Sequence, residues 1–172
     1  MRKVLFIFGE LTDGDVEWLS KAGERVHADP GTVLIPLASR VDHLYIVLEG
    51  QLIVKSAAGL TLAKLESGEI VGEMSLVDPA PTAVSVEYAS AATLFRIPHA
   101  TLRAKLSVDF AFASRFYRAL CVFLADRMRA ATQRLGYGDV LPEQQGELNE
   151  NVLDTVHLAG ARFDRMLKKL AG

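Results

Sequence analysis

The sequence predicts an α+β fold, an antiparallel β-roll that resembles a jelly-roll barrel, with a helix before it and further helices after it. Three observations support this class. Between Asp29 and about Ile97, short apolar runs alternate with turn residues, as in all-β rolls. The segments on either side have apolar residues at helical spacing. The 172 residues, half of them apolar, suffice for one domain with a sizeable core and room for helical attachments.

The segment before the roll is expected to begin with packing residues and to continue as a helix. Residues Met1–Phe8 are too short for a signal peptide and lack a small-residue cleavage site, so we interpret them as the first packing segment of the domain. A short helix is predicted over Leu11–Ala28, with Thr12 or Asp13 as its N-cap. Its apolar stripe is Val16, Leu19 and Ala22.

The roll itself is predicted from six short runs separated by residues typical of turns. The expected strands are Thr32–Leu37, His43–Leu48, Gln51–Ser56, Thr61–Leu65, Ala83–Glu87 and Ala92–Ile97. The breaks include segments with glycine or proline, namely Asp29–Gly31, Glu49–Gly50, Ala58–Gly59, Ser67–Gly68 and Asp78–Pro81. Many short strands at regular spacing favour an antiparallel barrel or jelly roll.

Helical spacing returns after Pro98. A short helix is expected over His99–Leu106, and Asp109 can cap a long helix that runs to about Leu135. The long helix has a wide apolar face made by Phe112, Phe116, Leu120, Phe123 and Leu124. The final helix has one made by Val152, Val156, Ala159, Phe163, Met166, Leu167 and Leu170. We therefore predict a domain over 1–135 (roll about 29–98, long helix about 109–135), a linker over 136–150 and an amphipathic helix over 151–172.

Two pairs of segments carry a resemblance to a known family. The first pair is Val33–Pro36 followed by Asp42–Leu52, and the second is Leu65–Leu76 followed by Pro81–Val86. In order and spacing they resemble the cyclic-nucleotide-binding domain family. That family includes the effector domains of bacterial catabolite-activator-type regulators, protein kinase A regulatory subunits and cyclic-nucleotide-gated channels. The resemblance covers about residues 11–135.

The second pair of segments contains the candidate ligand site. A short helix that starts at Gly72 would offer unpaired backbone N–H groups to an anion, and a glycine there lets a phosphate approach the backbone closely. The resemblance implies that Glu73 holds a ribose hydroxyl and that the ligand is cyclic AMP or cyclic GMP. The candidate ligand-binding residues are Gly72, Glu73, Met74, Ser75, Thr82 and Ala83.

The chain departs from the family pattern at one position of this site. Family members that bind cyclic nucleotide usually carry an arginine ten residues after the site's glycine, where this chain has Thr82 followed by Ala83. Losing a charged hydrogen bond costs roughly 1.5–3 kcal/mol, or about ten- to a hundred-fold in affinity. Several alternatives stay open. The site can bind weakly, prefer another ligand, or receive a guanidinium from Arg40, Arg96 or Arg127. The short helix can also merely close the roll.

Other chemistries find little support. The histidines, at positions 27, 43, 99 and 157, have no metal-ligand spacing, so no metal is expected. No nucleophile motif or catalytic constellation is present, and we expect no enzyme. The single cysteine, Cys121, lies in an apolar helical stretch and is interpreted as a buried structural thiol. No apolar run is long enough to cross a membrane, so the cytoplasm is the expected compartment.

The charge balance bears on partners. A net charge of −2 argues against a generally basic nucleic-acid surface. Five arginines make the long helix basic, namely Arg115, Arg118, Arg127, Arg129 and Arg134, and a solvated face is the simpler interpretation. The segment after that helix is too short for the winged helix-turn-helix domain of the catabolite-activator-type regulators, so direct DNA binding is not expected.

The helices leave the assembly open. The apolar face of the long helix can cover its own roll, form a dimer seam, or do both along its length. The terminal helix can fold back, pair with a symmetry mate or dock on another protein. A homodimer through the 109–135 helix, the terminal helix or both is favoured. The leading hypothesis is a non-enzymatic module that senses a cyclic nucleotide or related phosphate ligand. The alternatives are a ligand-free interaction adaptor and a transcription regulator without its own DNA-binding domain.

Overall fold

Two four-stranded antiparallel sheets form the centre of the protein, in a computed structural model that describes residues 4–134 and 150–171. The first sheet has the order β1 (Glu24–Ala28), β8 (Ala92–Pro98), β3 (His43–Glu49) and β6 (Ile70–Val71). The second has the order β2 (Val33–Ile35), β7 (Val84–Tyr88), β4 (Leu52–Ser56) and β5 (Thr61–Leu65). The predicted antiparallel β-roll is confirmed, as two facing sheets rather than a closed barrel.

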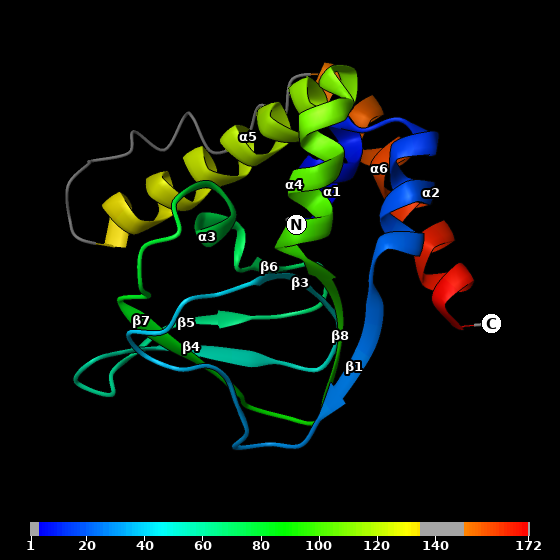
Figure 1. Cartoon of the computed structure of the whole chain (residues 1–172). Coiled ribbons are helices and arrows are strands. Elements are labelled where there is room, and N and C mark those ends of the chain that lie inside the picture. The colour runs from blue at the N-terminus through cyan, green and yellow to red at the C-terminus, as the bar shows by residue number, and fades with distance from the viewer. Residues whose placement is uncertain (1–3, 135–149, 172) are drawn as a thin grey trace.

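Helices gather on one side of the roll (Figure 1). They are α1 (Val4–Glu10), α2 (Asp13–Ala22), α3 (Glu73–Val77), α4 (His99–Val108), α5 (Phe110–Arg134) and α6 (Glu150–Ala171). Helices α1, α2, α4 and α6 cluster at one end of the sheets, and α5 runs from this cluster out across the short helix α3 (Figure 1).

The first sheet is buried on both faces, which makes it the middle layer of three. In β3, Leu44, Ile46 and Leu48 pack in the cluster that contains the helices. Tyr45 and Val47, which point the other way, pack in the cluster shared with the second sheet. Because alternate residues of a strand face opposite sides, this nearly continuous apolar strand serves two cores at once.

The predicted helix over Leu11–Ala28 is wrong in its last third. Helix α2 ends at Ala22, and residues Glu24–Ala28 form β1, paired antiparallel with β8. At the break, a Cβ on Gly23 would lie 2.3 Å from the carbonyl oxygen of Arg96. The glycine therefore lets the chain lie against β8 and begin pairing with it. The two-residue strand β6 was not predicted from the sequence.

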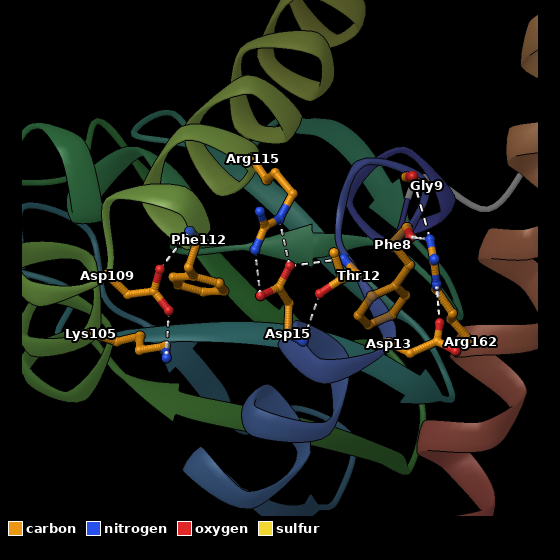
Figure 2. A network of polar contacts seen from close by, with 10 residues as sticks. All are labelled: Phe8, Gly9, Thr12, Asp13, Asp15, Lys105, Asp109, Phe112, Arg115 and Arg162. Carbon is orange, nitrogen blue, oxygen red and sulfur yellow. Dashed lines mark hydrogen bonds and ion pairs between the residues drawn. The ribbon is translucent and has the colours of Figure 1, made fainter.

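The terminal helix folds back on the helices at the start of the chain. In α6, Ala159, Phe163 and Met166 are buried, and the ring of Phe163 stacks on Phe8 with the ring centroids 5.9 Å apart. Arg162 adds polar contacts, since its Nε lies 2.7 Å from Oδ1 of Asp13 and its Nη1 donates to the carbonyl oxygen of Phe8 at 2.9 Å (Figure 2). Three alternatives were open for this helix, and the described part of its apolar stripe matches the first of them: the helix folds back and packs on its own chain.

A second polar group joins α2 to α5. The hydroxyl of Thr12 accepts a hydrogen bond from the N–H of Asp15 and the carboxylate of Asp15 accepts one from the N–H of Thr12, which makes a capping box at the start of α2. Both carboxylate oxygens of Asp15 also accept hydrogen bonds from Arg115, at 2.7 and 2.9 Å (Figure 2). Asp109 caps α5 as predicted, because its Oδ1 accepts a hydrogen bond from the N–H of Phe112 at 2.9 Å.

The inward face of α5 is largely the predicted one. Phe112, Phe116, Leu120 and Phe123 are fully buried, whereas Leu124 is only partly buried. The single tryptophan, Trp18 on α2, packs against this face with its ring centroid 5.5 Å from that of Phe112.

The interpretation of Cys121 as a buried thiol is wrong. The residue is exposed, since it follows the buried Leu120 by one position and so points about 100° away from it around the helix.

Candidate functional site

The candidate site is built around α3, which follows directly from β6. Gly72 lies between them and has a φ of 92°, in the left-handed region that favours glycine. A Cβ at this position would lie 2.2 Å from the carbonyl oxygen of His43 on β3. The turn from β6 into α3 therefore requires glycine for the chain's own packing, in addition to the reason that the sequence suggested.

Glu73 begins α3 and is 1 % exposed. Its carboxylate forms an ion pair with Arg127 of α5, and Nη2 of Arg127 donates to the carbonyl oxygen of Ile70 at 2.8 Å. The guanidinium also lies over the ring of Phe123, 4.9 Å from its centroid. Burial raises the pKa of Glu73, and the charge and hydrogen bond of Arg127 work against that rise. The carboxylate is thus satisfied inside the chain.

A second arginine holds the other end of α3. Nη2 of Arg103, on α4, donates to the carbonyl oxygens of Ser75 and Leu76 at 3.1 and 3.2 Å. Carbonyls at the C-terminus of a helix lack partners within the helix and attract positive charge. Arg103 was not predicted, because nothing in its sequence neighbourhood distinguishes it from a solvated helix residue. Arg127 was predicted only as one of three candidate arginines.

The structure places the other two arginines elsewhere. Arg40 is exposed, and Arg96 pairs with Glu24 on the neighbouring strand β1. Among the predicted residues of α3 itself, Ser75 is buried whereas Met74 is 65 % exposed.

Thr82 is engaged with the loop at 36–39. Its hydroxyl donates to the carbonyl oxygen of Pro36 at 2.9 Å and accepts a hydrogen bond from the N–H of Ser39 at 3.3 Å. Its backbone N–H and C=O pair with Ser39 and Ala38, each at 2.9 Å. Ala83, the next residue, is exposed. The described hydrogen bonds of Thr82 therefore fasten two loops together, and they do not join it to α3.

Two hollows lie away from these residues. One, of about 130 Å³, lies between α2 and α6 and is lined in part by Asp13, Glu17 and Arg165. The other, of about 290 Å³, lies where β1 ends and β8 begins, and His27 and Thr93 are in its wall. None of the predicted site residues lines either hollow. Within the described ranges, no three His, Cys, Asp or Glu side chains gather in a way that could hold a metal ion.

Comparison with known proteins identifies the family. The family model for the cyclic nucleotide-binding domain matches residues 25–109, which include the whole roll from Arg25 onwards, α3 and α4. Residues 25–109 therefore belong to the cyclic nucleotide-binding domain family, the regulatory family whose resemblance the sequence suggested.

Solved structures show the same fold. A cyclic nucleotide-binding domain from Methylobacillus flagellatus KT is 23 % identical and superposes with a TM-score of 0.70, covering 86 % of this chain and 85 % of that chain. The catabolite activator protein of Thermus thermophilus is 22 % identical, with a TM-score of 0.65 and coverage of 96 % of this chain and 86 % of that chain.

A curated relative is much longer than this chain. An uncharacterized NTE family protein of Mycobacterium tuberculosis is 24 % identical over 128 residues, which is 74 % of this chain and 22 % of that protein. The chain thus spans about a fifth of the length of the curated relatives that it matches. Among the described helices, none has the length and apolar composition needed to cross a bilayer.

Proposed function

We propose that the chain is a non-enzymatic regulatory module in which the positions of α3 and α5 are coupled through the ion pair between Glu73 and Arg127. The family match to a cyclic nucleotide-binding domain supports a regulatory role. The observation that carries the proposal is that Glu73, the residue expected to hold a ribose hydroxyl, is bound by an arginine from α5. A ligand that takes this carboxylate must displace Arg127 and thereby release α5 from α3.

The proposed ligand is a cyclic nucleotide or a related phosphate compound that binds weakly at Gly72–Ser75, with Thr82 and Ala83 nearby. Weak binding has two physical reasons. Position 82 supplies no positive charge, and the ligand must compete with Arg127 for Glu73. A ligand shifts such an equilibrium only by its difference in affinity for the two states.

Calorimetry and thermal melting with cyclic AMP, cyclic GMP and cyclic dinucleotides test the proposal. Thr82→Arg restores the missing charge and should raise affinity about ten- to a hundred-fold. Thr82→Gln, which loses the same hydroxyl contacts without adding charge, is the matched control and should not. Arg127→Gln should also tighten binding, because Glu73 then has no internal competitor. No heat and no rise in melting temperature for either the wild type or Thr82→Arg would refute ligand sensing.

A second candidate function is a ligand-independent interaction adaptor that has kept the family fold. The contacts of Thr82 favour it, because the hydroxyl that would face a phosphate already bonds Pro36 and Ser39. In that case neither Thr82→Arg nor Arg127→Gln gives a heat of binding with these nucleotides. The function to measure is then assembly.

For either function we propose a homodimer through α5. A line of residues spaced alternately four and three apart lies beside the fully buried residues of α5, with Leu124 partly packed against the core, and this spacing is that of a coiled-coil seam. The line is Phe110, Ser114, Tyr117, Cys121, Leu124, Met128 and Ala131. Within it Phe110 is 80 % and Met128 71 % exposed, unusual for large apolar side chains. Tyr117→Glu with Met128→Glu should yield monomers in light scattering, while Ala104→Glu on the exposed side of α4 should not. A wild type that is already monomeric at high concentration would refute the dimer.

A further inference from the structure

His99, the first residue of α4, is a buried ionisable group that the proposed function does not use. The residue is 2 % exposed, and its backbone N–H donates to the carbonyl oxygen of Asp42 at 2.8 Å. Among the described residues, neither ring nitrogen has a hydrogen-bond partner of normal geometry. Such buried polar atoms are rare in folded proteins and call for an explanation.

The ring of His99 lies where α4, β3 and the turn into α3 meet. The groups that influence its charge are Arg103 on α4, His43 and Asp42 at the start of β3, and the backbone of Gly72, which lies close without a hydrogen bond of normal geometry. Burial lowers the pKa of His99, and Arg103 and His43 lower it further, while Asp42 and Gly72 act in the opposite direction. The carboxylate of Asp42 instead contacts His43, with its Oδ1 2.6 Å from Nδ1 of that ring.

Helix α4 thus contacts both ends of α3. Arg103 binds the carbonyl oxygens at the C-terminus of α3, and His99, one helical turn earlier on the same face of α4, lies against Gly72. We propose that His99 is a proton-sensitive contact, which holds α4 against the turn into α3 while the ring is neutral and releases it when the ring takes up a proton.

The chemistry follows from burial and charge. A protonated ring would be a buried cation without a hydrogen-bond partner of normal geometry, one turn from the guanidinium of Arg103, and such a charge is strongly unfavourable. The ring must then turn toward water or toward Asp42, which separates the first turn of α4 from Gly72. This occurs at pH values below the ordinary histidine pKa of about 6.5. The device does not depend on whether α3 binds a ligand.

The other described histidines lack this arrangement. Nδ1 of His27 lies 2.9 Å from the hydroxyl of Thr93, at the end of the sheet where β1 stops. His157 is exposed on α6. His43 has the exposed carboxylate of Asp42 as its partner. His27 and His157 thus lie in surroundings unlike those of His99, whereas His43 is one of the groups that act on the His99 ring.

Nuclear magnetic resonance of the full chain between about pH 8 and about pH 5 tests the proposal, because this range covers histidine charging. The imidazole C–H signals and the amides of Gly72, Glu73 and Leu76 are followed together. We expect the α3 amides to shift with the midpoint of His99, below about 6.5. His99→Gln should abolish the amide shift and His43→Gln should retain it. Arg103→Gln should move both midpoints upward, since a like charge is removed.

Three results would overturn the proposal. They are α3 amides that stay fixed while His99 titrates, the same amide titration in His99→Gln, and a His99 ring that takes up no proton down to about pH 5. If His99→Gln does not fold, the wild type and Arg103→Gln decide. Midpoints of His99 and the α3 amides that move independently in Arg103→Gln refute the coupling, and midpoints that move together support it.

Discussion

The contact between Asp15 and Arg115 joins the start of the chain to α5, and its removal should be costly. Asp15 is 7 % exposed, and Arg115→Gln takes both charged hydrogen bonds from its carboxylate, which then keeps the one that it accepts from the N–H of Thr12. Loss of hydrogen bonds to a charged group costs about 1.5–3 kcal/mol. At about 2 kcal/mol, the melting temperature of a chain of this size should fall by about 4–8 °C.

The assay is urea unfolding of the wild type, Arg115→Gln, Asp15→Asn and the double variant, which together make a double-mutant cycle. We expect a coupling energy of about 1–3 kcal/mol. The matched control is Arg118→Gln, on the same helix, whose partner is Glu10 at 2.9 Å and whose side chain is 73 % exposed. An exposed pair of this kind contributes at most about 1 kcal/mol. Equal losses for the two arginine variants, or a coupling energy near zero, would refute the argument.

The same pair predicts how stability depends on acid. Burial would raise the pKa of Asp15, but hydrogen bonds from Arg115 and Thr12 outweigh it and hold the pKa below its usual value. Since the folded pKa lies below the unfolded one, the stabilisation is complete above about pH 3.9 and is lost as pH falls through the folded pKa. Unfolding free energies measured through this range should fall less steeply in Asp15→Asn than in the wild type. Parallel curves would contradict this.

Three further variants probe separate elements. Gly72→Ala should destabilise the fold by more than about 2 kcal/mol in urea, because its Cβ would collide with the carbonyl of His43 at a positive φ, and a loss below about 1 kcal/mol would contradict that geometry. Phe163→Ala should cost about 3–5 kcal/mol or free α6 from Phe8, so unchanged amide-exchange protection of α6 would exclude a docking role. Phe110→Ser should leave monomer stability within about 0.5 kcal/mol, since the side chain is 80 % exposed.

The sequence predicted the roll well because its strands carry strong local signals. In β3 and β8 the apolar residues alternate between the two cores, so these strands appear as apolar runs bounded by turn residues. β1 was included in the predicted helix, although the apolar stripe of that helix, Val16, Leu19 and Ala22, ends before it. The decisive interaction, pairing with β8, involves residues about seventy positions away, whose position local spacing cannot predict.

The site was predictable as a segment but not as a set of contacts. The family pattern located Gly72 and Glu73, because a glycine at a strand-to-helix turn has a local signature. The partners of α3 could not be found this way, since Arg127 is 54 positions from Glu73 and Arg103 is 28 from Ser75. Thr82 shows a further limit of prediction from sequence. Its position in the motif predicts the loop that it belongs to, but not the neighbour that its hydroxyl binds.

Trp18 gives the molecule a built-in optical reporter. The indole ring lies against Phe112 at the start of α5, and Nζ of Lys105 near the end of α4 is 5.5 Å from the ring centroid. A change in the angle between α4 and α5 would alter both the packing and the charge around this ring. Because the chain holds a single tryptophan, its fluorescence emission can be assigned to that junction without any added label.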